Sequence, residues 1–204
     1  MRSSAISGLL VEKGLRIFTT TDLSRLAGIS PGTASQILIR LSRAGVTKRL
    51  KRGIWANALL RDLAPYEAVP YLVSPWPSYV SLYSVLSDYG VIEEIPRVIY
   101  AVTSGPPRKL TTPVGSFHFH HLPEKLMWGY WMARAGAGSY PRAEPEKAFL
   151  DLCYLGLTIR SPLGLPRKRG RRWDLIGDKV RSYAAMFDFP PLKEYVAKEK
   201  FDRT

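Results

Sequence analysis

Residues 19–41 read TTTDLSRLAGISPGTASQILIRL, and this stretch decides the fold of the amino-terminal part of the chain. The pattern predicts a first helix over Asp22–Ala27, with Thr20 or Thr21 as its N-cap. The glycine at position 28 then supplies the chain reversal that ends this helix. Ser30 caps a second helix, and a proline follows at the first helical position, where its missing N–H costs nothing. The stretch therefore reads as two helices joined by a tight turn.

The second helix has two different faces. Its apolar residues recur at i, i+3, i+4 and i+7, which predicts one buried face, and they are Ala34, Ile37, Leu38 and Leu41. The opposite face is slim or hydrogen-bonding at its start and cationic toward its end. A helix that enters the major groove needs this order, because slim residues approach base edges and cations pass phosphates. The residues on this face are Gly32, Thr33, Gln36, Arg40 and Arg43.

A hairpin with a basic tip is expected after the second helix. Strands over Val46–Leu50 and Ile54–Ala56 would flank the turn Lys51–Gly53. A basic hairpin beside such a helix pair is typical of a winged helix-turn-helix, so duplex DNA is the first partner to consider. A winged helix that binds only protein remains the alternative. The candidate DNA-binding residues are Ser30, Gly32, Thr33, Ser35, Gln36, Arg40, Arg43, Lys48, Arg49, Lys51 and Arg52.

The charge of the chain is concentrated near its amino terminus. The 204 residues carry a formal net charge of +13, and residues 1–65 hold 11 Lys and Arg against 3 Asp and Glu. The remaining residues hold 19 against 14. A strongly basic surface attracts polyanions in general. Its placement on the expected helix and hairpin favours a nucleic-acid partner.

Composition excludes several other classes of protein. Hydrophobic residues make up 46% of the chain, which argues against general disorder. The sequence has no run of about eighteen apolar residues and no signal-peptide pattern, so we expect a cytoplasmic protein with no membrane partner. Cys153 is the lone cysteine, which rules out an intramolecular disulfide and a Cys-rich zinc site. Its apolar surroundings predict a buried structural thiol.

Prolines at positions 65, 70, 75 and 77 mark a boundary between two expected domains, residues 1–65 and residues 66–204. The second domain is predicted to be mixed α+β, with a small antiparallel sheet and carboxy-terminal helices, so the fold class is α+β. The elements expected after the first domain are helices over 59–63 and 79–89, strands over 97–103, 108–111 and 116–121, a pairing of 128–132 with 139–140, and helices from 144 and near 175–187 and 192–200.

Four motifs of the second domain occur in an order that indicates a family. They are SYVSLYSVLSDYG at 78–90, YAVT at 100–103, TPVGSFHFHHLP at 112–123 and PEKAFLDL at 145–152. Together with the winged helix they make the chain similar to the AbiEi-type antitoxins, also described as predicted transcriptional regulators of viral defence systems. The resemblance covers about residues 5–155 and fades after Leu155.

This resemblance implies a DNA-binding domain that represses its own operon at the promoter or operator. It also implies a second domain that opposes a nucleotidyltransferase-like toxin encoded beside it, functionally or by direct contact. The best-known pairs are called type IV because antitoxin and toxin need not form a stable complex. The alternative is a winged-helix regulator whose second domain senses a ligand or partner unrelated to any toxin. A homodimer or paired binding on DNA also stays open.

No pattern in the chain predicts catalysis. The histidines are His118, His120 and His121, and the expected strand that carries them has no Asp or Glu to complete a metal site. Alternation with two phenylalanines favours strand packing instead. The sequence lacks a Walker loop, a dinucleotide fingerprint, a Gly-X-Ser-X-Gly elbow and a paired Asp signature after Gly-Ser. We therefore predict a regulator that is not an enzyme, with no catalytic residue, no metal site and no cofactor.

A second basic run, residues 160–172, has two interpretations. It contains six cations and no carboxylate, while prolines and glycines prevent regular structure. It is either a solvated loop or a second contact for a polyanion, DNA or RNA. Trp173 beside it also has two interpretations, stacking on a base or anchoring the loop to the core, and the second is favoured. The candidate contacts are Arg167, Lys168, Arg169, Arg171 and Arg172.

Overall fold

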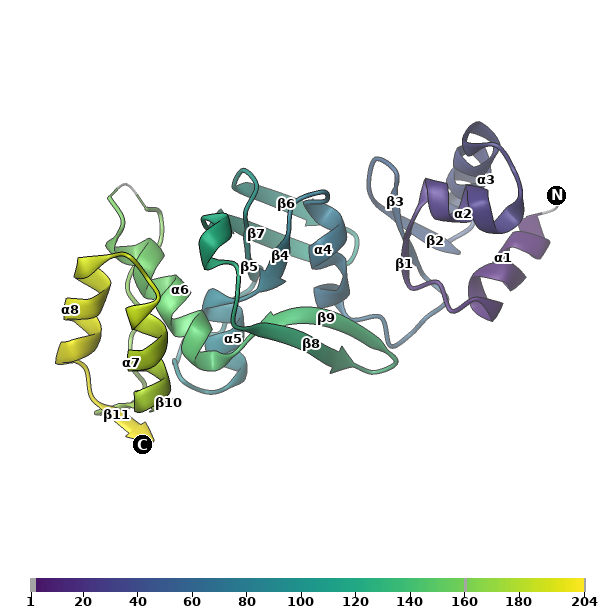
Figure 1. Ribbon diagram of the computed structural model, residues 1–204. Coiled ribbons are helices and arrows are strands. Elements are labelled where there is room, and N and C mark those ends of the chain that lie inside the picture. The colour runs from purple at the N-terminus through teal and green to yellow at the C-terminus, as the bar shows by residue number, and fades with distance from the viewer. Residues whose placement is uncertain (1–2, 160, 204) are drawn as a thin grey trace.

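The computed structural model describes residues 3–159 and 161–203 and confirms the α+β fold class (Figure 1). A winged helix-turn-helix forms one end, a six-stranded sheet lies in the middle, and two helices form the other end. The amino-terminal elements are α1 (Ser3–Glu12), β1 (Ile17–Thr19), α2 (Thr20–Ala27), α3 (Pro31–Arg43), β2 (Thr47–Lys51) and β3 (Ile54–Asn57).

Short-range capping contacts explain why α2 and α3 begin and end where they do. Thr19 caps α2, because its hydroxyl accepts the N–H of Asp22 at 3.0 Å and the Asp22 carboxylate accepts the N–H of Thr19 at 2.7 Å. The expectation of Thr20 or Thr21 as N-cap was therefore wrong, since only Thr19 stands three residues before an acid. Gly28 ends α2 with a φ of 62°, and Ser30 caps α3 as predicted.

The three strands β1, β3 and β2 form an antiparallel sheet, in that order, and each face of this sheet belongs to a different core. Phe18 and Trp55 pack in the core formed with α1, α2 and α3. Ile17, Ile54 and Ala56 lie in the core of the rest of the chain. The wing sheet is therefore shared between the two regions.

The central sheet is larger than expected and mixed. Its strand order is β6-β7-β5-β4-β9-β8, and β4 runs parallel to β9 while β5 runs parallel to β7. The expected sheet was antiparallel and lacked residues 78–80, which form a strand rather than the first turn of a helix. The parallel pairing of β5 with β7 also departs from that expectation. The strands are β4 (Ser78–Val80), β5 (Ile99–Thr103), β6 (Arg108–Thr112), β7 (Gly115–His121), β8 (Tyr130–Ala135) and β9 (Gly138–Ala143).

Helices cover and extend this sheet. Residues 59–63 form turns rather than the expected helix, and two short elements follow, η1 (Pro65–Ala68) and α4 (Val69–Leu72).

Within the described ranges, no helix has the length and apolar character needed to cross a bilayer. The remaining elements are α5 (Leu82–Asp88), η2 (Glu124–Leu126), α6 (Pro145–Leu157), β10 (Trp173–Ile176), α7 (Gly177–Ala185), α8 (Pro190–Lys198) and β11 (Phe201–Arg203).

Candidate nucleic-acid interface

Helix α3 presents the two faces that its sequence predicts. The four apolar residues from Ala34 to Leu41 are all buried in the core with α1 and α2. Gln36, Arg40 and Arg43 lie exposed on the opposite side. This burial fixes the rotation of α3, so its polar face points away from the protein and is open to a partner.

At the start of α3, the capping residue Ser30 hydrogen-bonds with Thr33. The Ser30 hydroxyl accepts the N–H of Thr33 at 3.2 Å and lies 2.9 Å from the Thr33 hydroxyl. Both residues are exposed, as is Gly32, whereas Ser35 is half-buried. These residues keep the helix end slim, which suits a close approach to base edges.

The sequence reasoning missed one residue on the exposed face of α3. Ile39 is 39% exposed and lies between Gln36 and Arg43 at helical spacing. An apolar side chain here can contact the methyl group of thymine. The signal was present in the sequence, because Ile39 is apolar yet stands outside the i, i+3, i+4, i+7 set of buried residues.

The wing is attached to the helix-turn-helix through Trp55. The Trp55 indole donates to the Thr20 hydroxyl at 3.0 Å, and the Arg49 guanidinium lies 5.8 Å from the centre of the Trp55 rings. Lys48, Arg49 and Arg52 are all exposed. The wing cations therefore extend from strands that are fixed against the helices.

Lys51 is the candidate that the structure separates from the others. A register shift between Arg49 and Lys51 breaks the strand alternation, so Lys51 pairs with Ile54. Its ammonium then donates to the carbonyl of Leu72 at the end of α4, at 2.8 Å. Burial lowers the pKa of Lys51, and the nearby charge of Arg108 lowers it further. Lys51 thus contacts the rest of the protein rather than facing outward.

The other exposed cations of α3 and the wing share one property, the absence of an ion-paired carboxylate among the described residues. Among residues 3–159 and 161–203, the structure places no ion-paired Asp or Glu beside them, although other cations of the chain are paired. Such a surface keeps its positive field, which favours a polyanion as its partner. We name this set the recognition surface, and it consists of Arg40, Arg43, Lys48, Arg49 and Arg52.

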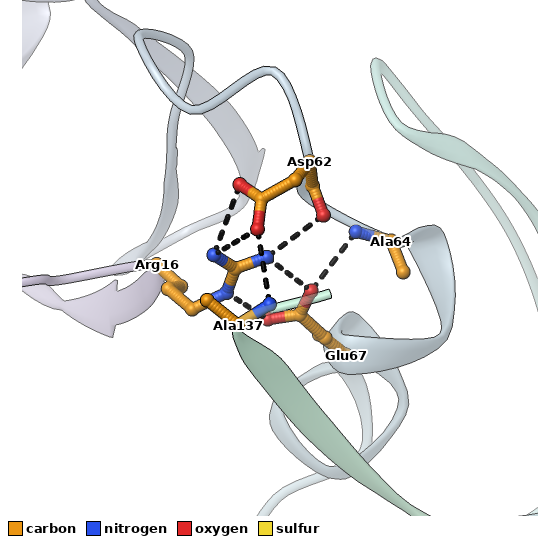
Figure 2. A network of polar contacts seen from close by, with 5 residues as sticks. All are labelled: Arg16, Asp62, Ala64, Glu67 and Ala137. Carbon is orange, nitrogen blue, oxygen red and sulfur yellow. Dashed lines mark hydrogen bonds and ion pairs between the residues drawn. The ribbon is translucent and has the colours of Figure 1, made fainter. Parts of the chain in front are cut away.

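Arg16 joins the winged helix to the rest of the protein (Figure 2). Its Nε and Nη2 donate to the Glu67 carboxylate at 2.6 and 2.8 Å, and its Nη1 donates to the Asp62 carboxylate at 3.1 Å. The Ala137 N–H, in the turn between β8 and β9, also donates to Asp62 at 3.1 Å. Together the Ala137 N–H and Arg16 lower the pKa of Asp62. This network fixes the winged helix against the central sheet.

The basic loop lies at the opposite end of the molecule from α3, next to β10 (Figure 1). Arg160 lies outside the described residues. The Glu199 carboxylate accepts hydrogen bonds from Lys168 at 2.6 Å and from the Trp173 indole at 2.9 Å. Trp173 is only 1% exposed, which confirms that it anchors the loop. The structure therefore does not bring this loop and the recognition surface together. The exposed loop cations are Arg167, Lys168, Arg169, Arg171 and Arg172.

The histidines of β7 pack beside an aromatic ring. The rings of His118 and His120 lie 5.5 and 5.9 Å from the ring of Tyr100. Burial, with smaller contributions from His118 and Lys109, lowers the pKa of His120 to about 4. Within the part of the chain that the structure describes, no group of three potential metal-ligating side chains converges. His118 and His120 thus share a face, as the alternation predicted.

Two of the sequence motifs of the second region meet inside the protein. The Asp151 carboxylate on α6 accepts hydrogen bonds from the Ser81 hydroxyl at 2.9 Å and from the Tyr79 hydroxyl at 3.1 Å. Lys147, one turn earlier on α6, pairs with Asp151 and donates to Tyr79 at 2.9 Å. All four residues are buried. These motif residues therefore build the core of the second region.

Comparison with known families agrees with the amino-terminal geometry. Residues 9–58 match a family model described as a transcriptional regulator, the AbiEi antitoxin. The matched range includes α2, α3 and the wing, and thus all eleven candidate DNA-binding residues, whereas the motifs from Ser78 onward lie beyond it. No curated protein matches the chain. The family match confirms the resemblance to the AbiEi antitoxin transcriptional regulators, and the winged helix-turn-helix carries it.

Proposed function

We propose that the protein is a DNA-binding antitoxin that represses its own operon and opposes a nucleotidyltransferase-like toxin encoded beside it. The observation that carries this proposal is the recognition surface. Its five exposed cations have no ion-paired carboxylate among the described residues, and all five lie within the range that matches the antitoxin family. A helix-turn-helix with such a surface suits the major groove and the flanking phosphates.

The recognition surface and the two exposed α3 residues Gln36 and Ile39 have distinct roles in this proposal. Gln36 reads a base edge, because its amide can donate to and accept from adenine at once. Ile39 contacts a thymine methyl group. Arg40, Arg43 and the wing cations bind phosphates and set the register of α3. With about six phosphates neutralised, log affinity should fall with log salt at a slope near −5.

The antitoxin role is proposed for residues 66–204. The support is the resemblance of the motifs between Ser78 and Leu152 to the AbiEi-type antitoxins. Tyr79 and Ser81 also make buried contacts with Asp151, so the motifs at 78–90 and 145–152 belong to one folded unit. A direct complex with the toxin is not required by this proposal.

A mobility-shift titration of the full chain tests the DNA-binding half. The probes are the duplex upstream of its own gene and a shuffled duplex of equal length. We expect a preference for the upstream duplex that Gln36→Ala weakens, by the 1–3 kcal/mol or so of a bidentate base contact. Equal affinity for both duplexes would contradict specific autorepression.

Growth rescue tests the antitoxin half separately. The full chain is co-expressed with the neighbouring toxin gene, and the Arg40→Ser/Arg43→Ser variant serves as the control. We expect the wild type to repress and to restore growth, whereas the variant should restore growth without repressing. Repression without any rescue would instead support the alternative, a regulator whose second region senses something other than a toxin.

A further inference from the structure

Strand β6 brings a cation of the second region next to the wing. β6 is an edge strand of the six-stranded sheet, and it contacts β2 of the winged helix. It begins with two exposed cations, Arg108 and Lys109. The wing is therefore not the only basic element at this junction.

The two cations of β6 point to opposite faces of the sheet. Arg108 pairs with Phe119, whose ring is buried, and the Arg108 charge lies near Lys51 of the wing. Lys109 pairs with His118, which lies against Tyr100 on the other face. Because cross-strand partners share a face, Arg108 is on the wing side and Lys109 is not.

The two charges where β6 meets the wing, those of Arg108 and Lys51, are both positive. Arg108 lies close enough to Lys51 for its charge to lower the Lys51 pKa, and the Lys51 ammonium is held by the Leu72 carbonyl. Within the described residues, neither cation has an ion-paired carboxylate. Like charges at close range repel, and a polyanion would remove this cost.

The position of Arg108 relative to the wing is fixed before any partner binds. The wing sheet shares a core with α4 and the central sheet, and the contacts of Arg16 with Asp62 and Glu67 add a polar connection. A cation held by a preformed scaffold loses little freedom on binding. Arg108 can therefore act together with the wing.

We propose that Arg108 completes the phosphate-binding surface of the wing, so that the DNA interface includes both regions of the protein. This inference rests on the proposed DNA binding and extends it to the second region. Phosphates flanking the groove that α3 enters are the ligand, contacted by Arg52 from the wing and by Arg108 from β6.

The matched pair Arg108→Gln and Lys109→Gln tests the inference, because both variants remove one exposed charge from the same strand. Affinity of the full chain for the upstream and shuffled duplexes is measured over a series of salt concentrations. For Arg108→Gln we expect about two- to fivefold weaker binding to both duplexes and a salt slope that is less steep by about one. Lys109→Gln should match the wild type, and Arg108→Lys should restore the slope.

Equal affinities and salt slopes for Arg108→Gln and Lys109→Gln would overturn the inference. The proposed function would still stand if Arg40→Ser weakens DNA binding. A wild type that binds no duplex would overturn both. Thermal unfolding checks that each variant is folded. A further experiment uses the wild-type protein and a duplex shortened at the end that the wing contacts. Loss of the phosphate that Arg108 binds should make the salt slope less steep by about one. An unchanged slope would also overturn the inference.

Discussion

The recognition surface and the basic loop each expose five cations, yet the protein treats the two groups differently. The cations of the recognition surface stand on α3 and the wing with no carboxylate partner in the described chain. In the loop, Lys168 is paired with Glu199, and the same carboxylate holds the buried indole of Trp173. Charge counts alone make these segments equivalent. The difference lies in what holds each group, because one loop cation and Trp173 share the Glu199 carboxylate, whereas the cations of the recognition surface stand on α3 and the wing hairpin.

Neutralising each group in turn should produce the largest difference. Replacing all five cations of the recognition surface by Ser should weaken DNA binding at least about a hundredfold and bring the salt slope close to zero, because most phosphate contacts are lost. Replacing Arg167, Arg169, Arg171 and Arg172 should leave both quantities unchanged. Fluorescence anisotropy over a series of salt concentrations measures them. Similar losses from the two variants would end the distinction between the surfaces.

The stability of the second region should depend on its buried ion pair, Lys147 with Asp151. Lys147→Met leaves the fully buried carboxylate of Asp151 without its cation, which should lower the free energy of unfolding by about 3–5 kcal/mol. The double variant Lys147→Met/Asp151→Asn removes both charges and should recover more than half of this loss. Urea denaturation of the full chain measures both. A double variant no better than the single one would show that packing, rather than charge pairing, sets the cost.

Arg16 provides an intermediate case, a cation of the winged helix that is paired. Arg16→Ala should lower the free energy of unfolding by about 2–3 kcal/mol, because Glu67 is only 4% exposed and would lose its partner. Arg181→Ala is the control, since its pair with Asp178 is exposed and should contribute less than about 0.5 kcal/mol. Equal losses in the two variants would show that burial of the carboxylate does not set the cost of removing its cation.

The smallest effect concerns a group that burial keeps uncharged. The pKa of His120 is lowered to about 4, so between pH 6.5 and pH 4 the unfolded chain takes up a proton that the folded chain does not. Stability should therefore fall as pH falls through this window, by about 2 kcal/mol between pH 7 and pH 5. His120→Phe keeps the contact with Tyr100 and should make stability less dependent on pH. Denaturation at pH 7 and pH 5 measures this, and an equal pH dependence in the variant would contradict the assignment.

The helix-turn-helix could be predicted from sequence because its signals are local. Gly28, Ser30 and the apolar face of α3 act within one or two turns of chain. β1 and β4 could not, because each has three residues and depends on distant partners, as in the pairing of Ile17 with Ala56. The position of Lys51 depends on a register shift that no composition reveals. The Arg16 network joins segments more than forty residues apart, so only the folded chain brings them together.

The shared wing sheet also limits how this protein can be recombined. Ile17, Ile54 and Ala56 contribute to a core that lies mostly outside the winged helix. A winged helix from another regulator, inserted in its place, would bring a polar outer strand face to this boundary and leave apolar surface of α4 uncovered. Chimeras joined in the segment before Pro65 should therefore fold only when the grafted sheet carries apolar residues on both faces. Exchange of the DNA-binding domain is therefore constrained here by a three-stranded sheet that contributes to both cores.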